Sequence, residues 1–262
     1  MARAIYRGLV ESGFPAENIG VVDPSEAAQS AARASGLIRI AESATDADLS
    51  ADLIVLAVKP QITGIALSPL AHRISSTTTV LSIIAGINSA SLANLLVLPN
   101  DDAVVRSMPN TPALVGEGMT GLFSNSDQRA HGRILAERVM SAVGQCVWVS
   151  NESDLDLVTA ISGSGPAYFF LFMESLADAA VELGMSPQTA HQLSVQTALG
   201  AAKLAQTSDD GLAKLRENVT SPGGTTEQAI ESFEASELRA IVMSATRAAK
   251  KRSIELSEEF GL

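Results

Sequence analysis

The sequence is poor in the residues on which several kinds of site depend. It has one cysteine, Cys146, so no disulfide can form within the chain, and its place in the apolar segment QCVWV predicts a buried, inert thiol. The three histidines, His72, His131 and His191, are far apart and have no partners at metal-ligand spacing, so we predict no metal site. With 18 basic against 29 acidic residues and a net charge of −11, the chain is not expected to bind nucleic acid or an anionic membrane surface.

Targeting and membrane signals are also scarce. The first residues are charged and helical in pattern, unlike a signal peptide, and we expect no apolar run long enough to span a bilayer. Together with the single cysteine, this predicts a cytoplasmic protein. An anionic cofactor remains compatible with the acidic chain, because helix N-termini and loop N–H groups bind phosphate locally. The 262 residues, 46% of them hydrophobic, suffice for one large domain or two ordinary ones.

Short apolar runs alternate with helical stretches in the first half of the chain. The runs are rich in Val and Ile and end in Gly, Pro, Asp or Asn, as strands buried on both faces do. The expected strands are NIGVVDP, DLIVLAVKP, TTVLSIIAGI, AVVRSMPN, GMTGLFS and QCVWVS. Between the first two lies a helix with Ser25 as its N-cap and Gly36 as its end. The alternation predicts an α/β domain over residues 1–150 with a doubly wound, Rossmann-like parallel sheet.

The first segment, MARAIYRGLVESGFP, has the pattern of an amphipathic helix that ends at Gly13. A doubly wound nucleotide-binding domain normally begins with a strand and a glycine-rich turn before its first helix. Neither precedes this helix in the sequence as written. We therefore expect the first strand of the sheet and the cradle for a pyrophosphate to be missing from this stretch of chain.

The second half, residues 151–262, contains no convincing strand and predicts an all-helical domain. Small residues such as those in ALGAAKLA allow close helix packing, and a half this apolar is expected to form a homodimer. Its long first helix is interrupted at Gly163, Gly165 and Pro166. We expect a helix N-terminus there, with N–H groups that could face an anion or a cofactor. A kink needed only for packing is the alternative.

Polar or small residues follow three of the expected strands, at the sheet edge where parallel sheets bind ligands. Lys59 ends the first of these, although a lone lysine is more often solvated. Ala85 and Gly86 follow the next and would let a ligand approach the backbone, as would an ordinary turn. Asn110 and Thr111 lie between two prolines in MPNTP, a rigid loop suited either to ligand positioning or to a structural turn.

The segment SPGGTT (221–226) is the strongest local signal for a binding site. Gly223 and Gly224 free backbone N–H groups to converge just before a helix, which makes a good cradle for a carboxylate. The hydroxyl groups of Ser221, Thr225 and Thr226 flank it, and a threonine hydroxyl can donate to or accept from a ring nitrogen. A plain capped loop is the alternative interpretation.

Several strings together carry a family resemblance. They are LAVKPQ, SIIAGI, VRSMPNTPALVGEG, VTAISGSGPAYFFLFMESLADAA, QTALGAAK and VTSPGGTTEQAI, and they occur in order over essentially the whole chain. In these strings the chain resembles pyrroline-5-carboxylate reductase, the last enzyme of proline biosynthesis, which reduces the cyclic imine Δ1-pyrroline-5-carboxylate to L-proline with NAD(P)H.

The resemblance implies two sets of site residues. Those expected to line the cofactor are Ala57, Val58, Lys59, Pro60, Ala85 and Asn218. Those expected to hold the substrate are Glu152, Ser221, Gly224, Thr225 and Thr226. We expect the amides around Gly224 and Thr225 to bind the substrate carboxylate, and Thr226 to act as the catalytic residue by hydrogen-bonding the ring nitrogen.

The cofactor is expected to be NADPH or NADH. The family usually uses NADPH, but Asp23 ends an early strand, and an acid there suits the free ribose hydroxyls of NADH. The resemblance further implies interlocked homodimers, and some members assemble five dimers into a decameric ring.

Two other functions stay open. Another dehydrogenase with a Rossmann-like and a helical domain would typically carry a catalytic lysine on the interdomain helix, where this chain has Ser162, Ser164 and Tyr168. A helical dimer without a cofactor, retained as a scaffold, is the other.

Overall fold

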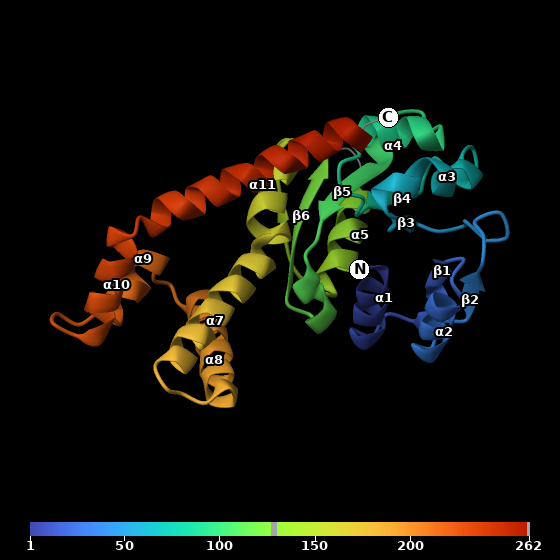
Figure 1. Cartoon of the computed structure of the whole chain (residues 1–262). Coiled ribbons are helices and arrows are strands. Elements are labelled where there is room, and N and C mark those ends of the chain that lie inside the picture. The colour runs from blue at the N-terminus through green and yellow to red at the C-terminus, as the bar shows by residue number, and fades with distance from the viewer. Residues whose placement is uncertain (127–129, 261–262) are drawn as a thin grey trace. The chain divides into compact units, whose positions relative to one another are not determined.

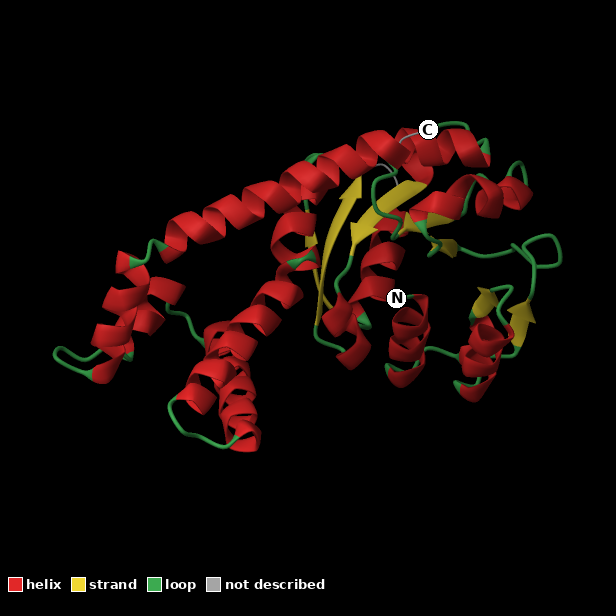
Figure 2. Cartoon of the chain, viewed as in Figure 1, coloured by secondary structure: helices red, strands yellow, loops and turns green. Residues whose placement is uncertain are grey.

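The computed structural model describes residues 1–126 and 130–260 of the chain. Its internal contacts divide it into two units (Figure 1). The sheet unit comprises Met1–Ser164 with Ala249–Leu262, and the helical unit comprises Gly165–Ala248. All strands lie in the sheet unit, as Figure 2 shows.

A five-stranded sheet with the order β3-β4-β5-β6-β7 forms the centre of the sheet unit. Its strands are β3 (Leu53–Leu56), β4 (Thr79–Ser82), β5 (Val104–Met108), β6 (Gly118–Ser124) and β7 (Gly144–Trp148). All neighbouring pairs are parallel except β5 and β6, which are antiparallel with Arg106 opposite Phe123. The expectation of a wholly parallel sheet was wrong for this pair. The nine-residue connection between them holds only one 3-10 segment (Thr111–Val115), and a parallel crossover needs about a dozen residues or more.

A second, two-stranded sheet pairs β1 (Gly20–Val22) with β2 (Arg39–Ala41) in parallel, and Val21 lies opposite Ile40. It is separate from the five-stranded sheet among the described residues (Figure 1). The sequence pattern did not predict β2, which is three residues long and carries no apolar run.

Helices cover the sheet unit. They are α1 (Ala2–Glu11), α2 (Glu26–Ala34), α3 (Thr63–Leu67), α4 (Ser89–Leu96), α5 (Ala130–Ser141) and α6 (Asp154–Val158). The predicted first helix is confirmed as α1, which buries Ile5 against the core around Leu81 and Leu122. The predicted helix 25–36 is confirmed as α2. Gly36 ends it with φ +86°, but Ser25 stands at the N-cap without a side-chain capping bond.

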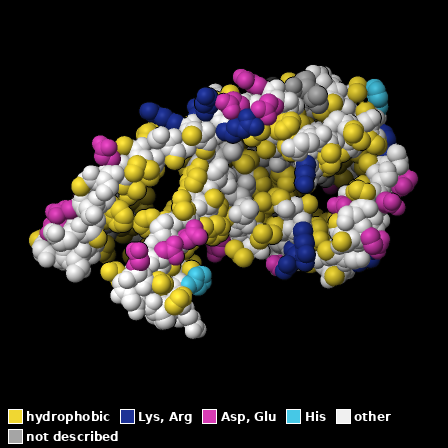
Figure 3. Space-filling model, in the orientation of Figure 1, with side chains coloured by type: hydrophobic (Ala, Val, Ile, Leu, Met, Phe, Trp, Pro, Cys, Tyr) yellow, Lys and Arg dark blue, Asp and Glu magenta, His cyan; other side chains and the backbone are white. Residues whose placement is uncertain are grey.

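The helical unit consists of α7 (Gly165–Glu182), α8 (Pro187–Thr207), α9 (Leu212–Asn218), α10 (Thr225–Ala235) and the first part of α11 (Leu238–Phe260). Between residues 165 and 260, the buried residues are Gly165, Ala190 and Ser194. Large apolar side chains are exposed instead: Phe169 is 65% and Leu183 89% exposed, and hydrophobic side chains gather on these helices in Figure 3. This unit therefore does not bury its own apolar surface.

One helical segment differs from its predicted form. As predicted, a helix (α7) begins in the SGSGP stretch at Gly165 with Pro166 in its first turn, but it continues directly from another helical turn rather than from a free end. Residues Thr159–Gly163 form a π-helical turn between α6 and α7, in which Ser164 N donates to Thr159 O at 2.8 Å. Gly163 ends this turn, and Gly165 and Pro166 lie at the start of α7, because a π turn shifts the hydrogen-bonding register without ending the helix.

The same stretch also bears on the expectation that no apolar run is long enough to span a bilayer. Asp154–Glu182 is long and apolar enough to cross a membrane by length and composition, with a mean hydropathy of 1.3 in its most apolar window. Core helices of soluble proteins pass the same test, so it decides little by itself.

Cys146 is half-buried, not fully buried as predicted, and lies on β7. Its partial burial raises the pKa of the thiol, against a smaller opposing effect of the hydrogen bond from Ser141 Oγ at 3.6 Å. The protonated, unreactive form is therefore favoured, in agreement with the predicted inertness.

Candidate active site

The carboxyl ends of β3 and β4 present the first group of predicted site residues. Ala57 and Val58 follow β3 and are half-buried, whereas Lys59 is exposed. Pro60 begins a 3-10 turn here, and Lys59 O accepts hydrogen bonds from Ile62 N at 3.1 Å and Thr63 Oγ1 at 3.2 Å. The backbone is thus held while the lysine ammonium stays open to solvent. Among the described residues no carboxylate pairs with it.

The loop after β4 brings Ala85 to the same edge. Ala85 is exposed, and Gly86 adopts φ +78°, which favours glycine. A Cβ on Gly86 would stand 3.1 Å from Leu256 O in α11, so the C-terminal part of that helix backs the loop. The loop is also held at its start, where Ile83 N donates to Leu56 O at 3.0 Å and Ser107 Oγ donates to Ser82 O at 2.9 Å.

Asp23 lies directly after β1 and is half-buried. Its Oδ1 accepts from Ser25 N at 2.9 Å, and its carbonyl oxygen accepts from Gln29 Nε2 at 2.9 Å. These bonds orient the carboxylate and leave Oδ2 without a protein partner among the described residues. Asp23 thus holds residues 23–29 in place through hydrogen bonds to Ser25 and Gln29.

Glu152 precedes α6 and connects three elements of the sheet unit. Its Oε1 accepts from Ser89 N at 2.7 Å, from Ser89 Oγ at 2.8 Å and from Arg106 Nη1 at 3.1 Å. The ion pair is shielded, because the side chains of Arg106 and Glu152 are 14% and 27% exposed. Sequence reasoning missed Arg106 and Ser89. They lie 46 and 63 residues from Glu152, and no local pattern links residues so far apart.

Asn110 of the MPNTP loop is 9% exposed and uses its whole side-chain amide inside the protein. Its Nδ2 donates to Ser162 O at 3.0 Å, and its Oδ1 accepts from Met119 N at 2.9 Å. Pro166, four residues beyond Ser162, has no N–H to close the helical bond, so Asn110 supplies the donor. Of the two interpretations of this loop, the geometry favours the structural one for Asn110.

In the helical unit, the SPGGTT loop runs from the end of α9 into α10. Gly223 has φ +70°, and its N–H donates to Glu227 Oε2 at 2.6 Å. Gly224 is the N-cap of α10, and its N–H donates to Ser221 O at 3.0 Å. A Cβ on Gly224 would stand 2.7 Å from Ser221 Oγ and 2.9 Å from Ser221 O. Glycine is therefore required at 224 for this loop to close.

These bonds leave fewer backbone amides for the predicted carboxylate site than the sequence suggested. The amide of Gly224 was expected to face a ligand, but it is already bonded within the loop. The amides of Thr225 and Thr226 open the first turn of α10, where the helix dipole favours an anion. Thr225 is exposed and Thr226 half-buried. Asn218, at the end of α9, donates from Nδ2 to Asp210 Oδ2 at 3.2 Å.

The predicted residues thus fall into two groups, one in each unit. Those in the sheet unit are Asp23, Ala57, Val58, Lys59, Pro60, Ala85 and Glu152, and those in the helical unit are Asn218, Ser221, Gly224, Thr225 and Thr226. The first group lies at or near strand ends, as ligand sites of α/β sheets do.

Comparison with known proteins finds related families for both the N-terminal and the C-terminal part of the chain. Residues 152–256 match the family model described as pyrroline-5-carboxylate reductase dimerisation, and residues 1–86 match that described as NADP oxidoreductase coenzyme F420-dependent. A pyrroline-5-carboxylate reductase of Pseudomonas aeruginosa is 44% identical over 261 residues, which are 100% of this chain and 95% of that protein.

Solved structures agree. A pyrroline-5-carboxylate reductase from Coxiella burnetii is 39% identical, with a TM-score of 0.91 over 97% of this chain and 94% of the other. A Plasmodium falciparum pyrroline carboxylate reductase with NADP bound is 31% identical, with a TM-score of 0.82 over 97% of this chain and 93% of the other. The predicted Rossmann-like fold with a helical second part is thereby confirmed. The chain belongs to the pyrroline-5-carboxylate reductase family of nicotinamide-dependent oxidoreductases.

Proposed function

We propose that this chain reduces Δ1-pyrroline-5-carboxylate to L-proline with a reduced nicotinamide cofactor, in proline biosynthesis. The observation that carries the proposal is the relationship over the whole chain to proteins of that name, at up to 44% identity in the relatives described above. The SPGGTT loop supports it chemically, since it offers two helix N-terminal amides and two threonine hydroxyls for a small carboxylated imine.

The substrate is assigned first to residues of this loop. Amides at the start of α10, from Thr225 and Thr226, receive the carboxylate, and Ser221 adds its hydroxyl. Gly224 contributes by its lack of a side chain, which lets Ser221 fold against it. The hydroxyl of Thr226 hydrogen-bonds the ring nitrogen and orients the C=N bond, and the nitrogen takes its proton from water. Glu152 takes part through Oε2, because its Oε1 already has three donors.

The cofactor is assigned to the strand ends of the sheet unit, and the residues there fit it. Ala57, Val58 and Ala85 are small or medium-sized side chains that leave the backbone accessible, and the exposed ammonium of Lys59 can face a phosphate. Pro60 holds the turn after β3, and Asn218 adds an amide if it releases Asp210. When bound, the reduced nicotinamide supplies a hydride to the imine carbon. The protein contributes chiefly by orienting donor and acceptor.

We infer that NADH is preferred over NADPH. Asp23 holds a carboxylate oxygen free at the end of β1, where the ribose of a dinucleotide binds in folds of this type. Two unit charges about 4 Å apart repel by roughly 1 kcal/mol in water and roughly 4 kcal/mol at the effective dielectric of a protein surface, which would disfavour the 2′-phosphate of NADPH about fivefold or more. Replacing Asp23 with Ser should move the ratio of the NADH and NADPH dissociation constants toward NADPH by at least that factor.

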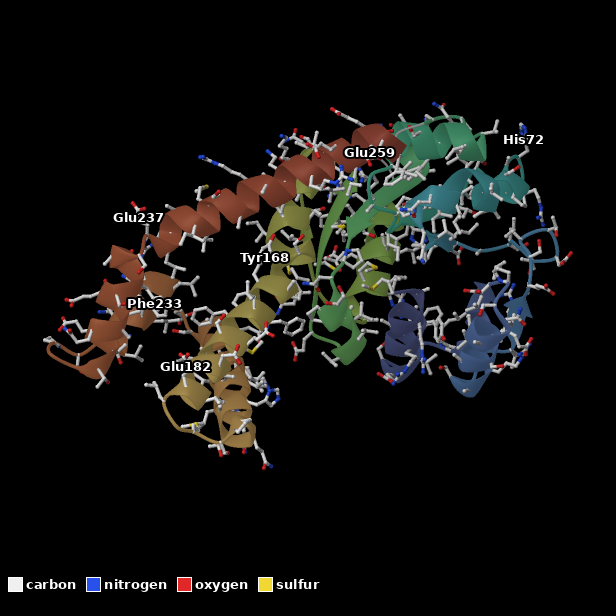
Figure 4. All side chains as sticks on the ribbon, viewed as in Figure 1. His72, Tyr168, Glu182, Phe233, Glu237 and Glu259 are labelled. Carbon is white, nitrogen blue, oxygen red and sulfur yellow. The ribbon has the colours of Figure 1, made fainter. Side chains whose placement is uncertain are left out.

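The working assembly is proposed to be a homodimer formed through the helical unit. The exposed apolar faces of α7, α8, α10 and α11 support this, since a monomer rarely leaves so much apolar surface in water (Figure 3). Phe233 on α10 and Tyr168 on α7 belong to these faces, at 40% and 38% exposed (Figure 4). Light scattering of the purified protein would report a dimer, or a decamer if five dimers join into a ring.

The two functions are assigned to separate parts of the chain. We propose that residues 1–150 bind the cofactor, with Asn218 as an addition from the second part, and that residues 151–262 bind substrate and form the dimer. The protein is proposed to act in the cytoplasm, where its half-buried, unpaired Cys146 stays reduced. Fractionation of the source cells with an antibody would locate it.

Turnover is the direct test of the proposed reaction. Pyrroline-5-carboxylate is supplied with NADH or NADPH, and loss of the absorbance of the reduced nicotinamide is followed. T226V, which keeps the shape of the side chain but loses the hydroxyl, should lower kcat by about 10²-fold, the lower end of the range typical of one positioned acid–base group. T207V is the control, because the Thr207 hydroxyl bonds only to carbonyls at the end of α8.

The outcomes separate the alternatives. No turnover with either cofactor by a folded protein would refute the reductase proposal, and the absence of any NADH or NADPH binding would favour a scaffold. Normal turnover by T226V would leave the reaction standing but remove Thr226 from it.

A further inference from the structure

We propose that Arg106 and Ser89 are positioning residues of this site, and that they act through Glu152 to hold the loop that carries Ala85. The inference rests on the proposed function, which assigns Ala85 to the cofactor. Arg106 lies in the string VRSMPNTPALVGEG, but the sequence predicted no role for it or for Ser89.

The contacts first show how α4 is held. Ser89 is the first residue of α4 and is fully buried, and its N–H and hydroxyl both donate to Glu152 Oε1. Asn88 caps the same helix, accepting from Ser91 N at 2.8 Å. A carboxylate at a helix N-terminus also interacts favourably with the helix dipole. Glu152 therefore ties the start of α4 to the chain segment before α6.

Arg106 then fixes Glu152. Arg106 is 14% exposed and lies on β5, between β4 and β6, so its guanidinium is anchored by the centre of the sheet. It places one nitrogen 3.1 Å from the oxygen that Ser89 uses. Without Arg106, Glu152 would keep a poorly hydrated negative charge with no counter-ion and would move toward solvent, away from Ser89.

The loop between β4 and α4 buries Ile84 and Ile87 in the core, and its polar anchors at the far end, among the described residues, are the bonds at Asn88 and Ser89. Its start is bonded to Leu56 and Ser107, and Gly86 is in contact with the backbone of Leu256. From Ile87 onward, the burial of Ile87 and the bonds at Asn88 and Ser89 together position the chain. Release of Ser89 from Glu152 should therefore let Ala85 and Gly86 shift, and a shift of about 1 Å in a positioning element can cost up to about 10²-fold in rate.

The test begins with hydrogen exchange, which needs neither substrate nor cofactor. In R106M, the amide of Ser89 should exchange at least about tenfold faster than in the wild type, and the dissociation constant of NADH, measured by its fluorescence, should rise about three- to tenfold. The kcat should fall about tenfold, while the KM for pyrroline-5-carboxylate changes less than twofold. R39M is the matched control, since it removes an exposed ion pair with Asp48 from the same unit and should change none of these values.

Two further variants separate geometry from charge. E152Q keeps an acceptor oxygen for Ser89, so exchange at Ser89 and NADH binding should stay within about threefold of the wild type, whereas E152A should match R106M. If R106M does not fold, S89A, which loses only the hydroxyl bond, should still raise exchange of the Ser89 amide about two- to fivefold.

Three results would overturn the proposal. They are an unchanged Ser89 amide in R106M or S89A, an NADH dissociation constant unaffected by R106M, and an E152Q variant as defective in both readouts as E152A. If the wild type reduces pyrroline-5-carboxylate while R106M behaves normally, the inference fails and the proposed function survives. If the wild type is inactive but exchange of the Ser89 amide and NADH binding respond as expected, the proposed function fails and the inference survives.

Discussion

Asn110→Ala should destabilise the sheet unit without any change at its surface. The side chain bridges Ser162 O and Met119 N at 3.0 and 2.9 Å, and it is 9% exposed. Pro166 cannot provide the missing donor to Ser162, so alanine at 110 leaves both partners without this bridge. Each buried group left unsatisfied costs about 1–3 kcal/mol, which gives roughly 2–4 kcal/mol for the pair after some relaxation.

That loss is large against the total. Domains of ordinary stability unfold at about 5–15 kcal/mol, and each kcal/mol shifts the melting temperature of a chain this size by roughly 2–4 °C. We therefore expect a decrease of about 6–12 °C for 3 kcal/mol. Asn110→Asp should be no better, because it keeps the acceptor for Met119 N but turns a carboxylate oxygen toward the Ser162 carbonyl.

Urea unfolding at fixed protein concentration would measure the effect, because dimer formation makes stability depend on concentration. Trp148 is the only tryptophan and lies on β7, with the Arg133 guanidinium 4.1 Å from the centre of its ring, so its emission reports this unit alone. Asn125→Ala is the control, since Asn125 is exposed and its side chain bonds, within the part of the chain that the structure describes, only to Asp101. A decrease below about 0.5 kcal/mol for Asn110→Ala, no larger than an exposed substitution, would refute the reasoning.

Two more predictions concern reactivity and substrate binding. Because burial raises the pKa of Cys146, less thiolate is present at neutral pH. Alkylation of Cys146 by iodoacetamide at pH 7.5 should therefore be slower in the folded protein than in urea, and it should accelerate as the pH rises. Equal alkylation rates in the folded protein and in urea would contradict this. Gly224→Ala would force a Cβ to within 2.7 Å of Ser221 Oγ, so the KM for pyrroline-5-carboxylate should rise about tenfold at unchanged NADH affinity, whereas Gly211→Ala, with open space around it, should have little effect. A normal KM in Gly224→Ala would exclude the loop from substrate binding.

Much of the fold was predictable because burial imposes periodicity on the sequence. All six predicted strands are confirmed, since each is a short apolar run with a clear end. Strand direction was not predictable in the same way: β6 has the same apolar pattern whether it runs parallel or antiparallel to β5. The π turn at Thr159–Gly163 was also out of reach, because glycine and proline indicate a break in a regular helix but not which kind.

The candidate site was predictable only where its parts are local. The SPGGTT loop could be found because glycines, hydroxyl residues and a helix start lie within six positions. The hydrogen bonds within the loop could not be predicted. One of them engages the Gly224 amide, which was expected to bind the substrate carboxylate. Glu152 was proposed from resemblance alone, and its partners on β5 and α4 became visible only when the fold brought distant segments together. Roles assigned to the remaining site residues stay predictions.

Asn110 and Glu152 stand out in the sequence as polar residues beside apolar segments, and both are engaged inside the protein. Lys59, Ala85 and Thr225 are exposed, and the side chain of Lys59 stays open to solvent while its carbonyl oxygen accepts from Ile62 N. Asn110 bonds inside the protein through both Nδ2 and Oδ1, whereas Glu152 holds Ser89 and Arg106 through Oε1 alone. Evidence for function at Glu152 should therefore be sought in the order of the Ser89 amide before it is sought in turnover. Substitution at an exposed residue such as Thr225 should instead affect ligand binding and leave the fold unchanged.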